Sequence, residues 1–298
     1  MTQALRQTIF ELFDRIQINK IKITPHAAVE PTAVGRSKIG GTPDLPKGFA
    51  WPYYEAESFD GVRANRPLSF LAQINLAQAS VFDRDCRLPR EGVLSFFYEL
   101  QSQKWGFDLG DKGCARVFYF SQEADLVNTD CPKDLEQDAC LPTFSLSFES
   151  VASLPTYSNF CELPQAKGAS DLLLHQTQSP WDVYDALKAA YGCPFDDEWA
   201  VNTHLLGYPD VIQNPMEREC EEVTRGIYNG EPHLLSPELE ADILKASSDW
   251  TLLFQMGTLQ KDDFELMFGD CGHIYFWIKK EELRLKNFNN VWLILQCG

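Results

Sequence analysis

Two Gly-x-Pro-Asp segments carry the first residues that could do chemistry. Asp44 ends the segment 41–44, and Asp210 ends the segment 207–210. If the two loops occupy equivalent places, their carboxylates could line a shared groove and bind a cation or a hydroxylated ligand. The alternative is structural, because Pro-Asp favours a turn in which the Asp side chain accepts local backbone N–H groups. We favour the structural interpretation.

Gln73 and Gln255 are the second pair, and each lies inside an apolar strand candidate. Two amides presented into one pocket could bind a ligand. Alternatively, each amide bonds backbone or loop groups beside its own strand. A buried amide without partners is costly, so partners must exist under either interpretation. We favour the second.

Two loops combine aromatic residues with a carboxylate, the segment from Trp105 to Asp108 (WGFD) and the segment 268–270 (FGD), which ends at Asp270. This combination suits carbohydrates or cationic ligands, and it also suits a loop anchored by its aromatic side chain. The candidate ligand-binding residues from all these motifs are Asp44, Gln73, Trp105, Asp108, Asp210, Gln255 and Asp270.

Catalytic and metal-binding signatures are missing from the sequence. None of the nine Cys forms a CxxC pair, and the five His include no HxH or HExxH spacing. Cys271 and His273 supply two potential ligands, but a zinc site needs two more. No GxSxG, Walker or GxGxxG motif occurs. The sequence therefore predicts no catalytic residues, no metal site and no cofactor.

The charge narrows the classes of partner. The formal net charge is −17, with no run of Lys or Arg, which disfavours nucleic acid and anionic membrane surfaces. No apolar stretch reaches the roughly 18 residues of a membrane span, and the N-terminal residues do not have the pattern of a signal peptide. We expect a cytoplasmic protein with mostly free thiols, whose favoured partner is a basic protein.

Hydrophobic spacing and turn residues predict the elements that position these groups. Apolar residues at helical spacing predict a helix over 4–16, and Ser-Pro starts predict helices over 180–191 and 237–247. The prolines at 25 and 31 predict an edge strand or extended arm over 19–34, and 211–235 is predicted to be mostly loop. Strands are predicted near 68–74, 92–100, 116–120, 143–148, 250–256, 273–278 and 291–296.

The order of these motifs repeats within the chain. A Gly-x-Pro-Asp loop, a Gln-containing strand, a Gly-started strand with paired aromatics and a further apolar strand occur in both 37–120 and 207–296. Chance is the alternative, because many strand–turn sequences contain Gly, Pro and apolar runs. A three-stranded meander cannot bury its apolar face alone, so two copies would cover one another. We predict a single α+β, β-rich domain over 1–298 with an internal duplication and peripheral helices.

The same motifs carry a family resemblance that covers the chain from about residue 30 to its end. SKIGGTPDLP from Ser37, PLSFLAQINL from Pro67, HLLGYPD from His204 and NVWLILQC from Asn290 resemble the YwqG-like family of bacterial domains of unknown function. The resemblance implies one mixed α and β domain with internal duplication. It implies no reaction and brings no catalytic residues.

Two hypotheses for function follow. The first is a non-enzymatic binding module that recognises another protein, motivated by the aromatic content, the negative charge and the missing catalytic signatures. The alternative is a small-ligand-binding protein or an enzyme with a cleft between the two halves, which would use Asp44, Asp210, Trp105 and Asp108.

Overall fold

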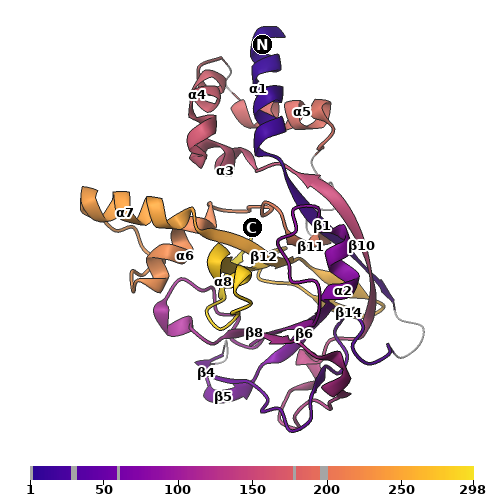
Figure 1. Cartoon of the computed structure of the whole chain (residues 1–298). Coiled ribbons are helices and arrows are strands. Elements are labelled where there is room, and N and C mark those ends of the chain that lie inside the picture. The colour runs from indigo at the N-terminus through magenta and orange to yellow at the C-terminus, as the bar shows by residue number, and fades with distance from the viewer. Residues whose placement is uncertain (1–2, 28–31, 59–60, 177–178, 195–200) are drawn as a thin grey trace.

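A computed structural model describes residues 3–27, 32–58, 61–176, 179–194 and 201–298 of the chain. Its main feature is a ten-stranded antiparallel sheet, which curves strongly around its long central strands (Figure 1). The strands, in spatial order, are β16 (Trp292–Gln296), β15 (His273–Lys279), β12 (Trp250–Met256), β11 (Thr203–Leu206), β1 (Ile18–Ala27), β10 (Phe144–Ser153), β2 (Lys38–Ile39), β6 (Ser69–Asn75), β7 (Val93–Tyr98) and β8 (Ala115–Phe120).

The strand order has two matching halves. β1 and β10 pair at the centre, β2-β6-β7-β8 extend from β10, and β11-β12-β15-β16 extend from β1. The pairing of β6 with β7 is irregular between Phe70 and Ala72, and that of β12 with β15 between Leu252 and Phe254. Both irregularities therefore lie just before the strand glutamine. The predicted β-rich α+β fold, in which a strand meander is duplicated, is confirmed.

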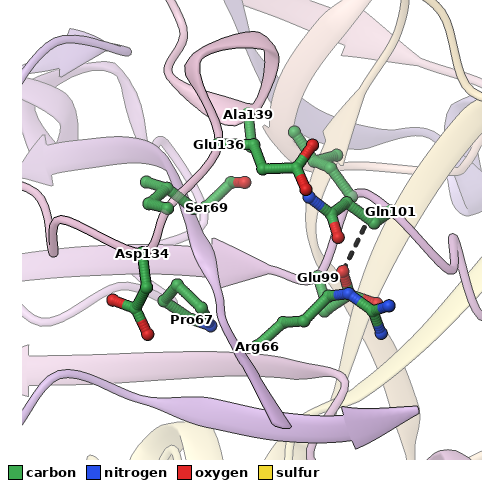
Figure 2. Close-up of a pocket in the computed structure, with 10 residues that line it drawn as sticks. Arg66, Pro67, Ser69, Glu99, Gln101, Asp134, Glu136 and Ala139 are labelled. Atoms are coloured by element: carbon green, nitrogen blue, oxygen red, sulfur yellow. Dashed lines mark hydrogen bonds between the residues drawn. The ribbon is translucent and has the colours of Figure 1, made fainter. Parts of the chain in front are cut away.

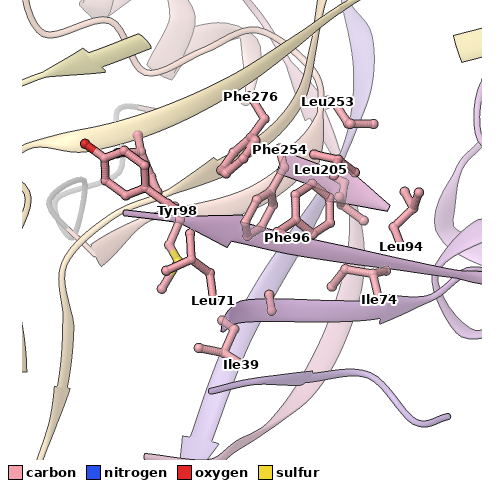
Figure 3. Packing of buried hydrophobic residues seen from close by; sticks show 14 of the residues in the cluster. Ile39, Leu71, Ile74, Leu94, Phe96, Tyr98, Leu205, Leu253, Phe254 and Phe276 are labelled. Carbon is pink, nitrogen blue, oxygen red and sulfur yellow. The ribbon is translucent and has the colours of Figure 1, made fainter. Parts of the chain in front are cut away.

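The two halves bury their inner faces in one common core (Figure 3). Phe96 of β7 lies 4.6 Å from Phe254 of β12 and 5.2 Å from Phe276 of β15, measured between ring centroids. All three side chains are fully buried. Because each buried aromatic contributes roughly 1.5–3 kcal/mol by burial, this contact couples the stability of one half to that of the other.

The structure corrects the prediction of an edge strand or extended arm over 19–34. β1 is a central strand that pairs with β10 on one side and with β11 on the other. Its pairing with β11 covers only Lys20–Ile23, so Pro25 lies where β1 has a partner on one side alone. Proline is tolerated there because no ladder bond requires its missing N–H.

Four helices form a lobe beside the sheet (Figure 1), namely α1 (Gln3–Ile16), α3 (Tyr157–Glu162), α4 (Lys167–Gln176) and α5 (Pro180–Tyr191). Phe13 of α1 packs on Phe160 and Tyr184, with ring centroids 6.2 and 5.6 Å apart. α5 begins at a proline in the first turn and ends at Gly192, which is left-handed with φ 101°. This is the start and stop that the sequence predicts for it.

The remaining helices lie in the connections between strands. They are α2 (Leu76–Ala79), α6 (Met216–Thr224), α7 (Pro237–Ser247) and α8 (Lys280–Arg284). α6 occupies part of the region predicted to be loop. Its acidic sequence hides a helical stripe of Met216, Cys220 and Val223, which packs on the outer face of the sheet.

Three short strand pairs complete the fold, β3 (Asp44–Pro46) with β9 (Leu126–Asn128), β4 (Tyr53–Glu57) with β5 (Arg63–Pro67), and β13 (Leu259–Lys261) with β14 (Phe264–Leu266). Single 3-10 turns lie at Ser80–Phe82, Leu109–Asp111, Glu123–Asp125, Gln137–Ala139 and Pro164–Ala166. In the part of the chain that the structure describes, none of the helices has both the length and the apolar character needed to cross a membrane.

Candidate functional site

Asp44 and Gln73 form a buried pair in the first half. The Gln73 Nε2 donates to Asp44 Oδ2 at 2.6 Å, and the Asp44 backbone N–H donates to Gln73 Oε1 at 2.9 Å. The same Nε2 also donates to the Arg36 carbonyl oxygen at 2.8 Å. The strand glutamine therefore ties the Gly-x-Pro-Asp loop to β6.

The other contacts of Asp44 leave no room for a ligand. Its Oδ2 lies 3.1 Å from Lys38 Nζ and accepts the Gly35 N–H at 3.0 Å, while its Oδ1 accepts from Asn128 Nδ2 at 3.1 Å. The residue is 0% exposed. Asp44 in this arrangement orders two loops around a buried charge, which Lys38 balances.

Asp210 and Gln255 repeat the pair in the second half. Gln255 Nε2 donates to Asp210 Oδ2 at 2.8 Å, and the Asp210 N–H donates to Gln255 Oε1 at 2.9 Å. Asn202 Nδ2 also donates to Asp210 Oδ2, at 2.7 Å. His204 lies opposite Gln255 in the β11–β12 register, just as Lys38 lies opposite Gln73 between β2 and β6.

The surroundings of Asp210 are more open than those of Asp44. The Asp210 side chain is 28% exposed, and its Oδ2 lies 3.5 Å from the buried His204 Nε2. Burial opposes ionisation of Asp210, but its polar and charged neighbours, among them Lys20 and the Gln255 amide, hold the pKa of this carboxyl well below its usual range. Burial lowers the pKa of His204, and Asp210 offsets part of that effect.

Trp105 and Asp108 line a surface groove of about 560 Å³. We name it the Trp105 groove. It lies between the β4–β5 hairpin, the 104–111 connection that follows β7, and the loop between α6 and α7. Its aromatic lining comprises Tyr54, Trp105, Phe107 and Tyr228, and its acidic lining comprises Glu55, Glu57, Asp108 and Asp111. Neither Asp44 nor Asp210 is among its lining residues.

The backbone of this connection is fixed to the edge strand β16. The Leu295 N–H donates to the Trp105 carbonyl oxygen at 3.0 Å, and Trp292 Nε1 donates to that of Gly106 at 2.8 Å. A Cβ atom at Gly106 would lie 1.8 Å from the Leu293 carbonyl oxygen, so only glycine permits this approach. The Asn229 N–H donates to the Phe107 carbonyl oxygen at 3.0 Å, which brings Tyr228 to the groove.

The Trp105 groove is more acidic than basic. Among the described residues its lining contains four carboxylates and two cations, Arg63 and Lys104, and Arg63 Nε already donates to Glu55 Oε1 at 2.7 Å. Asp108 Oδ1 accepts the Gly110 N–H at 2.6 Å, which orients its carboxylate. Burial raises the pKa of Tyr54, so its phenol stays protonated and donates to the Gly110 carbonyl oxygen at 2.8 Å. The groove therefore presents aromatic faces beside negative charge.

Asp270, the remaining candidate, lies elsewhere. Its loop is closed by the Gly272 N–H, which donates to the Phe268 carbonyl oxygen at 2.9 Å, and Phe268 itself is fully buried. The Asp270 side chain is exposed and does not line the Trp105 groove. The 268–270 loop is thus anchored by its buried aromatic side chain, Phe268.

A second, much smaller cavity lies near the β5–β6 junction (Figure 2). Its volume is about 60 Å³, and polar side chains dominate its lining, including Arg66, Glu99, Gln101 and Asp134. Ser69 Oγ is buried there and has no hydrogen-bond partner among the residues that the structure describes. Because water needs polar partners and little room, this cavity suits bound water rather than a ligand.

Part of the groove is visible in the sequence. Trp105 and Asp108 were visible as a local motif, whereas Tyr54, Glu57, Lys104 and Tyr228 were missed. These residues come from three separate connections, and no local pattern in the sequence signals that the connections meet.

Over the described ranges of the chain, no three His, Cys, Asp or Glu side chains are grouped as metal ligands.

Comparisons with known proteins place the chain in a family without assigning it an activity. A family model described as a domain of unknown function (DUF1963) matches residues 37–297. The curated proteins include no match to the chain.

Proposed function

We propose that this chain, which belongs to the DUF1963 family of domains of unknown function, is a non-enzymatic binding module that recognises a basic segment of another protein at the Trp105 groove. Within the family we propose that it is YwqG-like, on the motifs quoted from its sequence, and that it acts in the cytoplasm.

The lining of the groove is the observation that carries this proposal. Trp105 is 37% exposed and Tyr228 is 50% exposed, so their ring faces are accessible to a partner. A Lys or Arg side chain over such a face gains about 0.5–1 kcal/mol at an exposed site. Glu57 and Asp108 supply the negative charge that would pair with the same cation.

The charge of the whole chain supports the same partner. With a net charge of −17, the protein attracts cationic segments at long range and increases their association rate. Among the residues that the structure describes, the lining of the groove contains no Ser, Thr, Cys or His side chain, so it offers no nucleophile of the serine or cysteine type and no imidazole base. These features favour recognition over catalysis.

A small ligand such as a carbohydrate is the second candidate. The groove volume of about 560 Å³ falls within the range of small-molecule sites, and aromatic faces beside carboxylates suit sugar rings as well as cations. Salt dependence separates the two candidates, because binding of a basic peptide weakens strongly with ionic strength and binding of a neutral sugar does not.

Calorimetric titration with short Lys/Arg-rich peptides and with neutral oligosaccharides tests the proposal. Trp105→Ala should weaken peptide binding at least about tenfold, because the largest aromatic face is lost. Trp181→Ala is the matched control, since Trp181 is also exposed, at 55%, but lies on α5 in the helical lobe. Absence of binding to any basic peptide, or equal losses in the two variants, would contradict the proposal. Binding of oligosaccharides alone would favour the second candidate.

A further inference from the structure

We propose that the second half contains a binding site for a divalent transition-metal ion, with His204 Nε2, a carboxylate oxygen of Asp210 and the Asn202 Oδ1 as its protein ligands. This site is separate from the Trp105 groove, and the inference does not depend on the function proposed for that groove.

The hydrogen bonding of His204 provides the first argument. Its Nδ1 lies 2.8 Å from the Leu206 carbonyl oxygen, and because a carbonyl only accepts, Nδ1 carries the proton. The other nitrogen, Nε2, is buried and has no hydrogen-bond partner in the described part of the chain. A histidine that donates one ring N–H to a carbonyl and directs its other nitrogen inward is the usual arrangement of a metal ligand.

The distance to Asp210 provides the second argument. His204 Nε2 and Asp210 Oδ2 lie 3.5 Å apart, which is too long for a hydrogen bond of normal strength. Two ligand atoms at about 2.0–2.1 Å from one tetrahedral ion lie roughly 3.3–3.4 Å apart. A cation between the two atoms would therefore satisfy the unpaired Nε2 of His204, beside a carboxylate oxygen that already accepts from Gln255 and Asn202.

Asn202, which contacts Asp210 through its amide nitrogen, carries a further unpaired oxygen. Its Nδ2 donates to Asp210 Oδ2 at 2.7 Å, while its Oδ1 is buried and unpaired within the described residues. The Gln255 amide orients the carboxylate, as outer-shell groups do in metal sites. Because the Asp210 side chain is 28% exposed, an ion can enter from solvent and keep water ligands. This mixture of N and O donors suits ions such as Zn²⁺ or Co²⁺.

The first half supports the inference by contrast. At the position equivalent to His204, Lys38 places its ammonium group 3.1 Å from Asp44 Oδ2, so the cation is part of the chain. In the second half the bound ion would take the place of that ammonium group. Lys20 also acts on Asp210, but the two form no ion pair within 4.0 Å in the described ranges.

Titration of the full chain with Co²⁺, followed by absorption spectroscopy, tests the site. We expect one Co²⁺ ion to bind per chain, with an absorption spectrum typical of nitrogen and oxygen ligands and without a thiolate charge-transfer band. His204→Lys should lower the affinity at least about 100-fold, because it removes a ligand and installs the cation of the first half. The nine cysteines are the same in both proteins, so the difference between them isolates this site.

His204→Gln is a second variant that removes the ligand without adding a charge, and it replaces His204→Lys if the lysine variant is unfolded by circular dichroism. Each of the two variants, if folded, should no longer bind this Co²⁺ ion with the wild-type affinity. Cobalt binding of unchanged affinity in the folded variants would overturn the inference, as would a wild-type spectrum with thiolate bands only. Absence of Co²⁺ and Zn²⁺ binding to the wild type would overturn it as well.

Discussion

Replacing Gly106 with alanine tests how the Trp105 groove is held in place. Gly106 has φ 79°, and an added Cβ would lie 1.8 Å from the Leu293 carbonyl oxygen and 2.9 Å from its carbonyl carbon. These are backbone atoms of an edge strand, so no side-chain rotation relieves the overlap. The 105–107 segment must move away from β16, which breaks the hydrogen bonds of its Trp105 and Gly106 carbonyl groups.

The expected cost follows from these two effects. The left-handed backbone costs an alanine about 1–2 kcal/mol, and two lost hydrogen bonds, one of them with a buried Trp292 Nε1, add about 2–3 kcal/mol. Gly48→Ala is the matched control, because Gly48 has φ 78° and nothing lies within 4 Å of its added Cβ. We expect the free energy of unfolding to fall by about 3–5 kcal/mol for Gly106→Ala and by about 1–2 kcal/mol for Gly48→Ala.

Urea unfolding followed by far-UV circular dichroism measures both values under the same conditions. The Gly106→Ala protein should also lose peptide binding at the groove, whereas the Gly48→Ala protein should retain it. Equal destabilisation of the two variants, within about 0.5 kcal/mol, would refute the argument that contact with β16 fixes this connection.

Three further predictions concern the core, a buried ion pair and a carboxyl group with a raised pKa. Phe96→Ala should lower the free energy of unfolding by about 3–5 kcal/mol, because Phe96 contacts Phe254 and Phe276 of the other half. Circular dichroism and fluorescence should still report a single unfolding transition, whereas two separate transitions would mean that the halves are independent. Lys38→Met should lower the free energy of unfolding in urea by about 3–5 kcal/mol, because it removes the buried cation that pairs with the Asp44 carboxylate. A decrease below about 1 kcal/mol would show that another group balances this carboxylate. Burial and the charges of neighbouring glutamates raise the pKa of Glu219 to about 8 in the folded protein. The stabilisation from its protonated carboxyl is therefore complete below the pKa that Glu219 has in the unfolded chain, and it is lost as the pH rises from there towards 8. Glu219→Gln should remove this pH dependence of the unfolding midpoint, and an unchanged pH profile would contradict the assignment.

The sequence predicts the strands well because each strand has a clear physical signature. The apolar runs, their order and the Gly-x-Pro-Asp loops appear in the structure as two matching meanders. Helix α7 likewise begins where Ser236 accepts the Leu239 N–H, as its Ser-Pro start predicts. In each case the information lies within a few adjacent residues.

The errors have a different cause, which is tertiary context. β1 reads as an edge strand because of Pro25, and only the short reach of β11 shows why a central strand tolerates that proline. α6 reads as a loop because its charges obscure three apolar residues that face the sheet. Its carboxylates are held by cations of the fold, as in the 2.7 Å contact between Arg225 Nε and Glu221 Oε1.

The candidate site divides in the same way. The Asp44–Gln73 and Asp210–Gln255 pairs follow from the repeat, and the six-residue spacing from Lys38 to Asp44 recurs from His204 to Asp210. The substitution of His for Lys at this spacing was therefore visible in the sequence. The 3.5 Å separation of His204 from Asp210 and the buried Asn202 Oδ1 were not, because both depend on three-dimensional packing.

The Trp105 groove lies where the two matching halves differ. The β4–β5 hairpin lies in the connection from β2 to β6, and the α6–α7 pair lies in the equivalent connection from β11 to β12. Residues from both insertions line the Trp105 groove together with the connection from β7 to β8. The repeated strands thus form a scaffold, and residue substitutions within them should change mainly the free energy of unfolding. Recognition should depend on the parts that the two halves do not share, because only those parts place aromatic faces and carboxylates at one surface.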